Sequence, residues 1–192
     1  NSLLYFGTMI RKKGVFELAG IFNEVVRINP EITLTILGKD VFDRIEKRST
    51  LDIFKEKLSL VALQNFTYIN SVAYNEVQNY INQAAIIVLP SLAESFGLVA
   101  IESMSLEKPI VASDYAWNKE IIENNVSGVL ANPKDHIGFA NKILDIIDNK
   151  QSSIKMRKRA RVRVETYFNL EKITLINLQF YKKIKESKTL LN

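Results

Sequence analysis

Apolar and polar positions follow two patterns along the chain: short continuous apolar runs, and longer segments with apolar residues at three- and four-residue steps. The continuous runs predict parallel strands that are covered on both faces. The helical spacing is clearest where Val15, Leu18 and Phe22 form one stripe. The expected strands are Leu3–Phe6, Ile32–Leu37, Phe66–Ile69, Ala85–Leu89, Ile110–Ala112 and Gly128–Leu130. The expected helices cover 14–28, 50–60, 74–83, 98–106, 117–124 and 135–149.

The alternation of strands and helices predicts an α/β fold, a doubly wound parallel sheet of about six strands with helices on both faces. Two more helices are expected at 152–166 and 170–187, after the last strand. The second of these has a wide apolar surface, so we expect it to pack against another part of the protein. We therefore divide the chain into an α/β domain, 1–168, and a C-terminal helix, 169–192.

The composition is that of a globular protein, with 192 residues, 47% apolar and 24% charged. No apolar run reaches the roughly 18 residues that a membrane span needs, so none is predicted. The absence of cysteine excludes disulfides and thiolate metal sites, and it favours the cytoplasm as location. Because the chain starts at Asn1 and enters an apolar strand at once, we expect it to be a piece of a longer protein.

Positive charge is concentrated in residues 150–192, which hold twelve Lys or Arg and three acidic residues. Such a run is most simply a solvated helix face. Contact with an anionic membrane surface is the alternative, and it would place the protein peripherally at the inner face of the membrane. Nucleic acid is not indicated, because no recognition motif accompanies the charge. The basic cluster consists of Lys155, Arg157, Lys158, Arg159, Arg161 and Arg163.

A polar loop with two glutamates follows the apolar run Ala85–Leu89. Glu94 lies in this loop, and Glu102 follows eight residues later. A helix that begins near Gly97 would leave Glu94 before it and place Glu102 one to two turns inside it. Both carboxylates would then border one cleft at the carboxyl edge of the sheet, where open α/β folds bind ligands. Loop N–H groups and the positive helix end favour an anion there.

The first expected strand leads into a basic loop between Gly7 and Gly14, with the sequence GTMIRKKG. Arg11, Lys12 and Lys13 lie in this loop and at the N-terminus of the helix, which suits a phosphate group. The alternative is a solvated basic loop. The loop contains neither G-x-G-x-x-G nor a Walker sequence, so dinucleotide binding and ATP hydrolysis are not supported.

Together, these segments resemble those of retaining glycosyltransferases of the family 4 kind, which use nucleotide-sugar donors and have the GT-B fold of two Rossmann-like domains. The stretch from Glu94 to Glu102 resembles the E-x7-E motif, and GTMIRKKG resembles the family's G-R-x(4)-K-G segment. Residues 34–39, 66–72 and 108–114 resemble further segments in the same order. The resemblance covers essentially the whole chain and implies the C-terminal half of such an enzyme, with a Rossmann-like nucleotide-sugar-binding domain.

The resemblance implies a role for each matching residue. Glu102 would bind the ribose hydroxyls, because a carboxylate accepts two hydrogen bonds from a vicinal diol. Glu94, near the transferred sugar, and Lys13, which would offset charge on the leaving diphosphate, are the expected catalytic residues. The other residues expected to bind the donor are Gly7, Thr8, Arg11, Gly38, Lys39, Val72, Ser95, Phe96, Gly97, Leu98 and Val99.

Thr8 departs from the resemblance, because the family usually has arginine there. Either Arg11 or Lys12 replaces that cation from a neighbouring position, or diphosphate binds more weakly. His136 is the only histidine and lies at an expected helix start, so we interpret it as a structural surface residue. No D-x-D triplet occurs, so the resemblance implies chemistry without a metal or other cofactor, with a UDP- or GDP-linked sugar as substrate.

The implied activity is transfer of a hexose to a saccharide or lipid-linked acceptor, as in polysaccharide biosynthesis. We expect the chain to be inactive alone, because the acceptor site would belong to the missing N-terminal domain, onto which the last helix would pack. One alternative is a non-catalytic module that binds nucleotide sugar or serves in assembly. The other is a sugar-nucleotide epimerase of the same two-domain plan.

Overall fold

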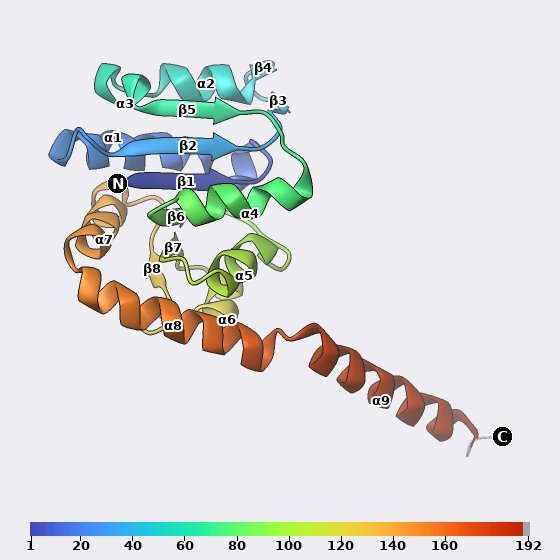
Figure 1. The fold of residues 1–192 in the computed structure, drawn as a ribbon. Coiled ribbons are helices and arrows are strands. Elements are labelled where there is room, and N and C mark those ends of the chain that lie inside the picture. The colour runs from blue at the N-terminus through green and yellow to red at the C-terminus, as the bar shows by residue number, and fades with distance from the viewer. Residues whose placement is uncertain (190–192) are drawn as a thin grey trace.

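Six parallel strands form one sheet in the computed structural model, which describes the backbone of residues 1–189 and the side chains of residues 1–186 (Figure 1). The sheet confirms the predicted α/β class, and the strand order is that of a Rossmann-like doubly wound fold. In order across the sheet, the strands are β5 (Phe66–Ile69), β2 (Thr33–Leu37), β1 (Ser2–Phe6), β6 (Ile86–Leu89), β7 (Ile110–Ser113) and β8 (Val129–Ala131).

Helices cover both faces of the sheet, and each face has its own hydrophobic core. Leu3 and Tyr5 of β1 belong to the first core and Leu4 and Phe6 to the second, because successive strand residues point to opposite faces. The first face is covered by α1 (Val15–Ile28), α2 (Thr50–Glu56), α3 (Leu60–Gln64) and α7 (His136–Asp148). The second is covered by α4 (Tyr74–Gln83), α5 (Leu98–Ser105), α6 (Ala116–Ile121) and much of α8 (Lys150–Tyr167).

The segment 50–60 differs from the prediction of a single helix. It holds α2, which ends at Glu56, and the start of a separate helix, α3, at Leu60. Ser49 and Ser59 are the N-caps, and each hydroxyl accepts a hydrogen bond from a backbone N–H in the first turn. The second serine starts a new helix because its side chain satisfies an N–H that an uninterrupted helix would pair internally.

A hairpin that the hydrophobic pattern does not predict lies between β2 and α2. Its strands, β3 (Phe42–Asp43) and β4 (Arg48–Ser49), pair antiparallel and stand apart from the main sheet. Each strand has only two residues, which is too short for an alternation of apolar and polar positions to be visible.

The chain reverses its winding between β1 and β6, the two central strands. In such sheets the carboxyl ends of these strands form a crevice that binds ligands. The loop between β1 and the short 3-10 helix η1 (Arg11–Lys13) lies on one side of this crevice, and the loop between β6 and α5 lies on the other. Both contain residues predicted to form the site.

The last two helices are arranged differently from each other (Figure 1). Helix α8 packs on the domain and buries Met156, Ala160 and Val164. Helix α9 (Leu170–Thr189) extends away from the domain, and none of its described side chains is buried. Residues 190–192 of the predicted C-terminal segment lie outside the described residues. Within residues 1–189, no helix is both long and apolar enough to cross a membrane.

Candidate functional site

Two loops from different parts of the sequence are joined at the carboxyl edge of the sheet. The Lys12 carbonyl oxygen accepts backbone N–H bonds from Leu92 and Ala93 at 2.9 and 3.0 Å. Gly14 has a φ of 69°, and an ideal Cβ at this position would lie 1.9 Å from the carbonyl oxygen of Pro90. Only glycine permits both this φ and this approach, so the two loops form one packed unit.

The two predicted catalytic side chains, Lys13 and Glu94, meet across these loops. Nζ of Lys13 lies 2.5 Å from Oε2 of Glu94, and the Ser91 hydroxyl donates a hydrogen bond to Oε1 at 3.0 Å. The side chains of Lys13 and Glu94 are 24% and 14% exposed. This pair is therefore shielded from water, which strengthens it relative to a surface ion pair.

Two helices begin at this site, α1 directly after Gly14 and α5 directly after Gly97. Both N-cap glycines have a left-handed backbone, with φ of 69° and 75°, and neither helix has a side-chain cap. The backbone N–H groups of both first turns are thus not taken by a capping side chain. Together with the positive ends of the two helices, they are suited to an anion.

A cavity of about 240 Å³ lies beside these loops, at the ends of β1, β2 and β5. Tyr74, at the start of α4, reaches Glu102 here, and its hydroxyl donates a hydrogen bond to Oε1 at 3.0 Å. Sequence reasoning missed Tyr74. Its position could have indicated it, because the residues that directly follow a parallel strand lie at the carboxyl edge of the sheet, where the site was expected. The predicted donor-binding residues that line the cavity are Gly7, Gly38, Lys39, Val72, Val99 and Glu102.

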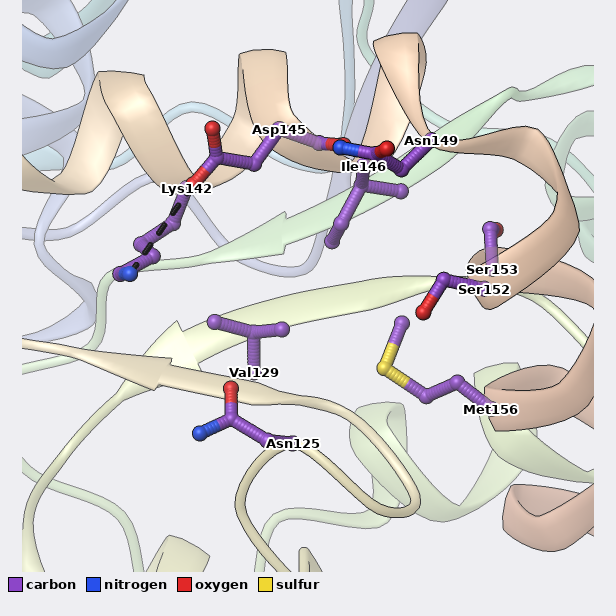
Figure 2. A pocket seen from close by; sticks show the side chains of 9 residues that line it. All are labelled: Asn125, Val129, Lys142, Asp145, Ile146, Asn149, Ser152, Ser153 and Met156. Atoms are coloured by element: carbon purple, nitrogen blue, oxygen red, sulfur yellow. Dashed lines mark hydrogen bonds and ion pairs between the residues drawn. The ribbon is translucent and has the colours of Figure 1, made fainter.

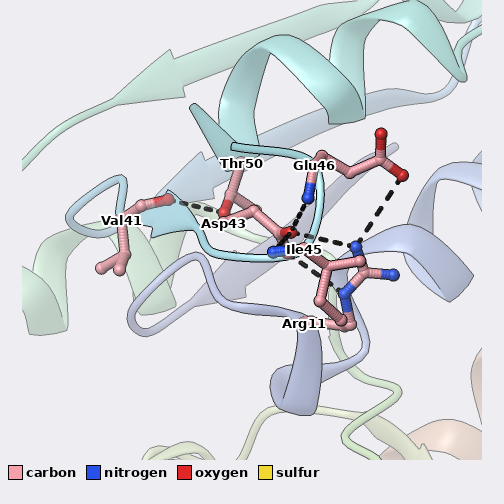
Figure 3. Close-up of polar contacts among 6 residues, drawn as sticks. All are labelled: Arg11, Val41, Asp43, Ile45, Glu46 and Thr50. Carbon is pink, nitrogen blue, oxygen red and sulfur yellow. Dashed lines mark hydrogen bonds and ion pairs between the residues drawn. The ribbon is translucent and has the colours of Figure 1, made fainter. Parts of the chain in front are cut away.

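Arg11 has a partner outside the predicted site (Figure 3). Its Nε and Nη2 atoms each donate a hydrogen bond of 3.1 Å to the carboxylate of Asp43 in the hairpin. The Asp43 side chain is 5% exposed and also accepts backbone N–H bonds from Ile45 and Glu46. The pKa of Asp43 is held below its usual range. The hydrogen bond from Arg11 is the main cause, and the backbone N–H of Glu46 adds to it. Arg11 thus fastens the basic loop to the hairpin.

Other predicted donor-binding residues lie at the surface around the crevice. Thr8 is exposed, and its carbonyl oxygen accepts a hydrogen bond from the Tyr5 hydroxyl at 3.1 Å. Ser95, Phe96 and Leu98 are exposed on the loop before α5 and at its start. Lys12, the other cation considered as a replacement for the family arginine, is exposed as well. These side chains are thus more exposed than those of Lys13 and Glu94.

The buried phenol of Tyr5 supports the base of this region. Burial raises its pKa far above the ordinary value, and the nearby charge of Glu94 raises it further. Tyr5 therefore stays protonated and can hold the loop at Thr8. His136 is half-buried against Gly20 of α1, where a Cβ would meet its ring, so it packs between α7 and α1.

A second cavity, of about 260 Å³, lies at the amino end of β8, next to α7 and α8 (Figure 2). Lys142 and Asp145 form an ion pair of 3.9 Å at its wall, and Val129 and Met156 supply apolar surface. None of the predicted site residues lines it. Among the residues that the structure describes, no group of His, Cys, Asp and Glu is arranged to hold a metal ion.

The fold is a Rossmann-like, doubly wound α/β domain with two packed loops at its central crevice, and the sequence places it in one family. The chain belongs to the family described as "Glycosyl transferases group 1", whose profile matches residues 1–163.

Two curated relatives show the range of this family. Glycogen synthase of Mycobacterium tuberculosis (strain H37Rv) is 27% identical over 179 residues, which are 93% of this chain and 42% of that protein. D-inositol 3-phosphate glycosyltransferase of Paenarthrobacter aurescens is 28% identical over 183 residues, which are 94% of this chain and 43% of that protein. The chain thus spans less than half the length of these relatives.

Solved structures agree with the fold. Sucrose-phosphate synthase from Thermosynechococcus elongatus superposes with a TM-score of 0.83 at 28% identity, over 97% of this chain and 46% of that one. HepE of Anabaena, solved in complex with UDP and glucose, has a TM-score of 0.81 at 20% identity, over 96% of this chain and 48% of its own. The fold is therefore that of one half of a GT-B glycosyltransferase.

Proposed function

We propose that this chain is the donor-binding domain of a retaining glycosyltransferase, which transfers a hexose from a nucleoside diphosphate sugar to a saccharide or lipid-linked acceptor. The observation that supports this best is the ion pair of Lys13 and Glu94, 2.5 Å apart where α1 and α5 begin. A diphosphate is bound by a cation and free N–H groups, and a sugar hydroxyl by a carboxylate. The site offers both types of group side by side.

In this proposal the nucleoside occupies the cavity of about 240 Å³. Glu102 accepts hydrogen bonds from the ribose hydroxyls, and the backbone around Val72 contacts the base. Gly38 and Lys39 also line this cavity. UDP and GDP are the nucleotides proposed for the donor, and no metal or other cofactor takes part.

The chemistry proposed for Lys13 is electrostatic. As the bond between the sugar and the diphosphate breaks, negative charge grows on the leaving diphosphate. Lys13 and the N-termini of α1 and α5 are oriented before the reaction begins, and such preorganised groups stabilise developing charge effectively. Glu94 would hold the transferred hexose near this centre, and the E-x7-E arrangement supports retention of configuration.

A second candidate is a module that binds nucleotide sugar without catalysing transfer. Thr8 takes the place of the family arginine, and Arg11 is held by Asp43 rather than facing the crevice pair. The site therefore offers Lys13 as its shielded cation, which favours binding over strong stabilisation of a leaving group. The two candidates differ in turnover and share the nucleotide site.

The acceptor site is proposed to lie on a second domain, because the chain spans less than half of its relatives. Helix α9 supports this proposal, since two of its large apolar residues are exposed: Phe180 is 58% exposed and Ile176 is 63% exposed. We propose that this helix packs on that second domain, and that the chain is inactive alone.

The basic cluster on α8 is proposed to contact an anionic membrane surface from the cytoplasm. Arg161 and Arg163 bond to carbonyl oxygens of the domain, at Ser105 and Ile121 respectively, so they fasten α8. The side chains of Lys155, Lys158 and Arg159 are exposed and supply the proposed contact. Sedimentation with vesicles of anionic lipid, against neutral vesicles, tests it: equal recovery with both would remove the proposal.

The donor site is tested by calorimetry of UDP, GDP and ADP, and of their sugar conjugates, with and without EDTA. Lys13→Ala and Glu102→Ala should each weaken the nucleotide that binds, by about tenfold or more for a charged hydrogen-bond partner. Lys55→Ala and Glu120→Ala are matched controls, because both side chains are exposed and outside the cavity. If no nucleotide binds at millimolar concentration, or if the controls weaken binding equally, the donor-domain proposal fails.

A further inference from the structure

Tyr74 is an exposed residue with a fixed hydroxyl group. It begins α4 directly after the turn that carries Val72, and 81% of it is exposed. Its hydroxyl nevertheless donates a hydrogen bond to Oε1 of Glu102 on α5, at 3.0 Å. Because so little of the ring is buried, apolar packing does not orient it, and the bond to Glu102 does.

The Glu102 carboxylate depends on this bond in return. It is half-buried in the second turn of α5, and within the described part of the chain Tyr74 is the one residue that hydrogen-bonds it. An ionised carboxylate has about four lone-pair positions on its two oxygens. Tyr74 uses one of them, which leaves room for both hydroxyls of a vicinal diol.

Tyr74 and Glu102 together stand between two cavities. They line the cavity of about 240 Å³ at the carboxyl edge, and they also line one of about 370 Å³ between α4 and α5. Val77 contributes to both as well. The hydrogen bond therefore joins α4 and α5 at the border of the proposed nucleoside site. The direction of the Glu102 carboxylate there decides which hydroxyl groups this carboxylate can bind.

We propose that Tyr74 is a positioning residue, which directs the Glu102 carboxylate toward the two ribose hydroxyls and so makes the site select ribonucleotides over 2′-deoxyribonucleotides. This inference rests on the proposed function, because it needs a nucleoside diphosphate in the cavity. The hydrogen bond to Glu102 also raises the pKa of the Tyr74 phenol. The hydroxyl consequently keeps its proton and remains a donor at neutral pH.

The test is calorimetry of this chain with UDP and 2′-deoxy-UDP, with GDP and 2′-deoxy-GDP in parallel. The variants are Tyr74→Phe, Glu102→Ala, the double variant, and Tyr80→Phe as a matched control on the same helix outside both cavities. Wild type should bind the ribonucleotide about tenfold more tightly than its deoxy form, the value of one hydrogen bond to a charged group. Tyr74→Phe should weaken the ribonucleotide about fivefold and the deoxy form less than about twofold.

In the Glu102→Ala background, Tyr74→Phe should add nothing, and Tyr80→Phe should leave all affinities unchanged. If Tyr74→Phe weakens both forms equally or neither, or if wild type does not distinguish them, the inference is overturned. The proposed donor site would still stand in that case, provided that Glu102→Ala weakens the ribonucleotide. If wild type binds neither UDP nor GDP, the proposed function and this inference fail together. The thermal unfolding of Tyr74→Phe is compared with that of wild type. If the two curves match, a lost preference for the ribonucleotide does not come from unfolding of the variant.

Discussion

Nζ of Lys13 lies 2.5 Å from Oε2 of Glu94, so the cation and the carboxylate neutralise each other. The two side chains come from loops that follow different strands, and Ser91 bonds the second oxygen of the same carboxylate. In the proposed function, a diphosphate would have to compete with Glu94 for the lysine. The pair would then set both the affinity for that anion and the position of the carboxylate.

Glu94→Gln should separate these two effects. Loss of the negative charge releases Lys13, so the affinity for the nucleoside diphosphate alone should rise about threefold, by the removal of a partly shielded ion pair. The additional affinity that a sugar conjugate has over the bare nucleotide should fall. Titration of both ligands checks this, and a rise for the conjugate as large as for the nucleotide would show that Glu94 does not contact the sugar.

Asp43→Asn should destabilise the chain in a way that depends on pH. The bond from Arg11, followed by backbone N–H bonds, lowers the pKa of Asp43 in the folded state. The ionised form therefore adds stability above the ordinary aspartate pKa of about 3.9, and this contribution is lost as pH falls through the lower folded value. The difference between wild type and Asp43→Asn in urea unfolding should be constant near neutral pH and shrink in acid.

Glu31→Gln is the control for that series, because Glu31 is exposed in the turn between α1 and β2. Its curve should follow wild type across the pH range. An Asp43→Asn difference that stays unchanged from pH 7 into strong acid would show that the carboxylate charge does not hold the hairpin.

Gly14→Ala should be far more damaging than Gly7→Ala. Both glycines have positive φ, at 69° and 137°, so both substitutions strain the backbone by about 1–3 kcal/mol. Only at position 14 would the added Cβ collide with backbone, 1.9 Å from the Pro90 oxygen, whereas the nearest atom at position 7 is the Tyr5 hydroxyl at 3.8 Å. Denaturant unfolding of the two variants measures the difference, and equal losses would mean that the contact with Pro90 is easily relaxed.

Replacing two exposed apolar residues of α9, Ile176→Ser with Phe180→Ser, should leave the stability of the chain within about 0.5 kcal/mol of wild type. These side chains are 63% and 58% exposed and do not belong to either core. Binding of a hydrophobic dye should decrease, because the exposed apolar surface is smaller. Val164→Ser on α8 is the contrasting variant: that residue is buried, and its loss should lower the melting temperature clearly.

The central strands of the sheet were predictable because they are covered on both faces. Ile86–Leu89 is buried at every position, and the sequence shows this as a continuous apolar run. The end of α1 at Asn29 was likewise visible from the proline that follows it. Buried strands and long helices leave a clear pattern of apolar residues in the sequence. The central strands and α1 could therefore be predicted from that pattern.

The candidate site was predictable only in part. The spacing of Glu94, Gly97 and Glu102 indicated a loop and a helix start, and α5 begins where it was expected. The partner of Arg11 was not predictable, because Asp43 lies in a hairpin with strands too short to show a pattern. Tyr74 was missed for a related reason: its contact with Glu102 joins two helices, and neither helix alone indicates it.

The contact of Gly14 with Pro90 has a consequence for the exchange of parts between relatives. Main chain lies against main chain there, with no flexible side chain between them to absorb a misfit. A chimera that took the loop after β1 from one protein and the loop after β6 from another would have to match two backbone paths at once. The two segments, although distant in sequence, are best treated as a single cassette that is transplanted whole.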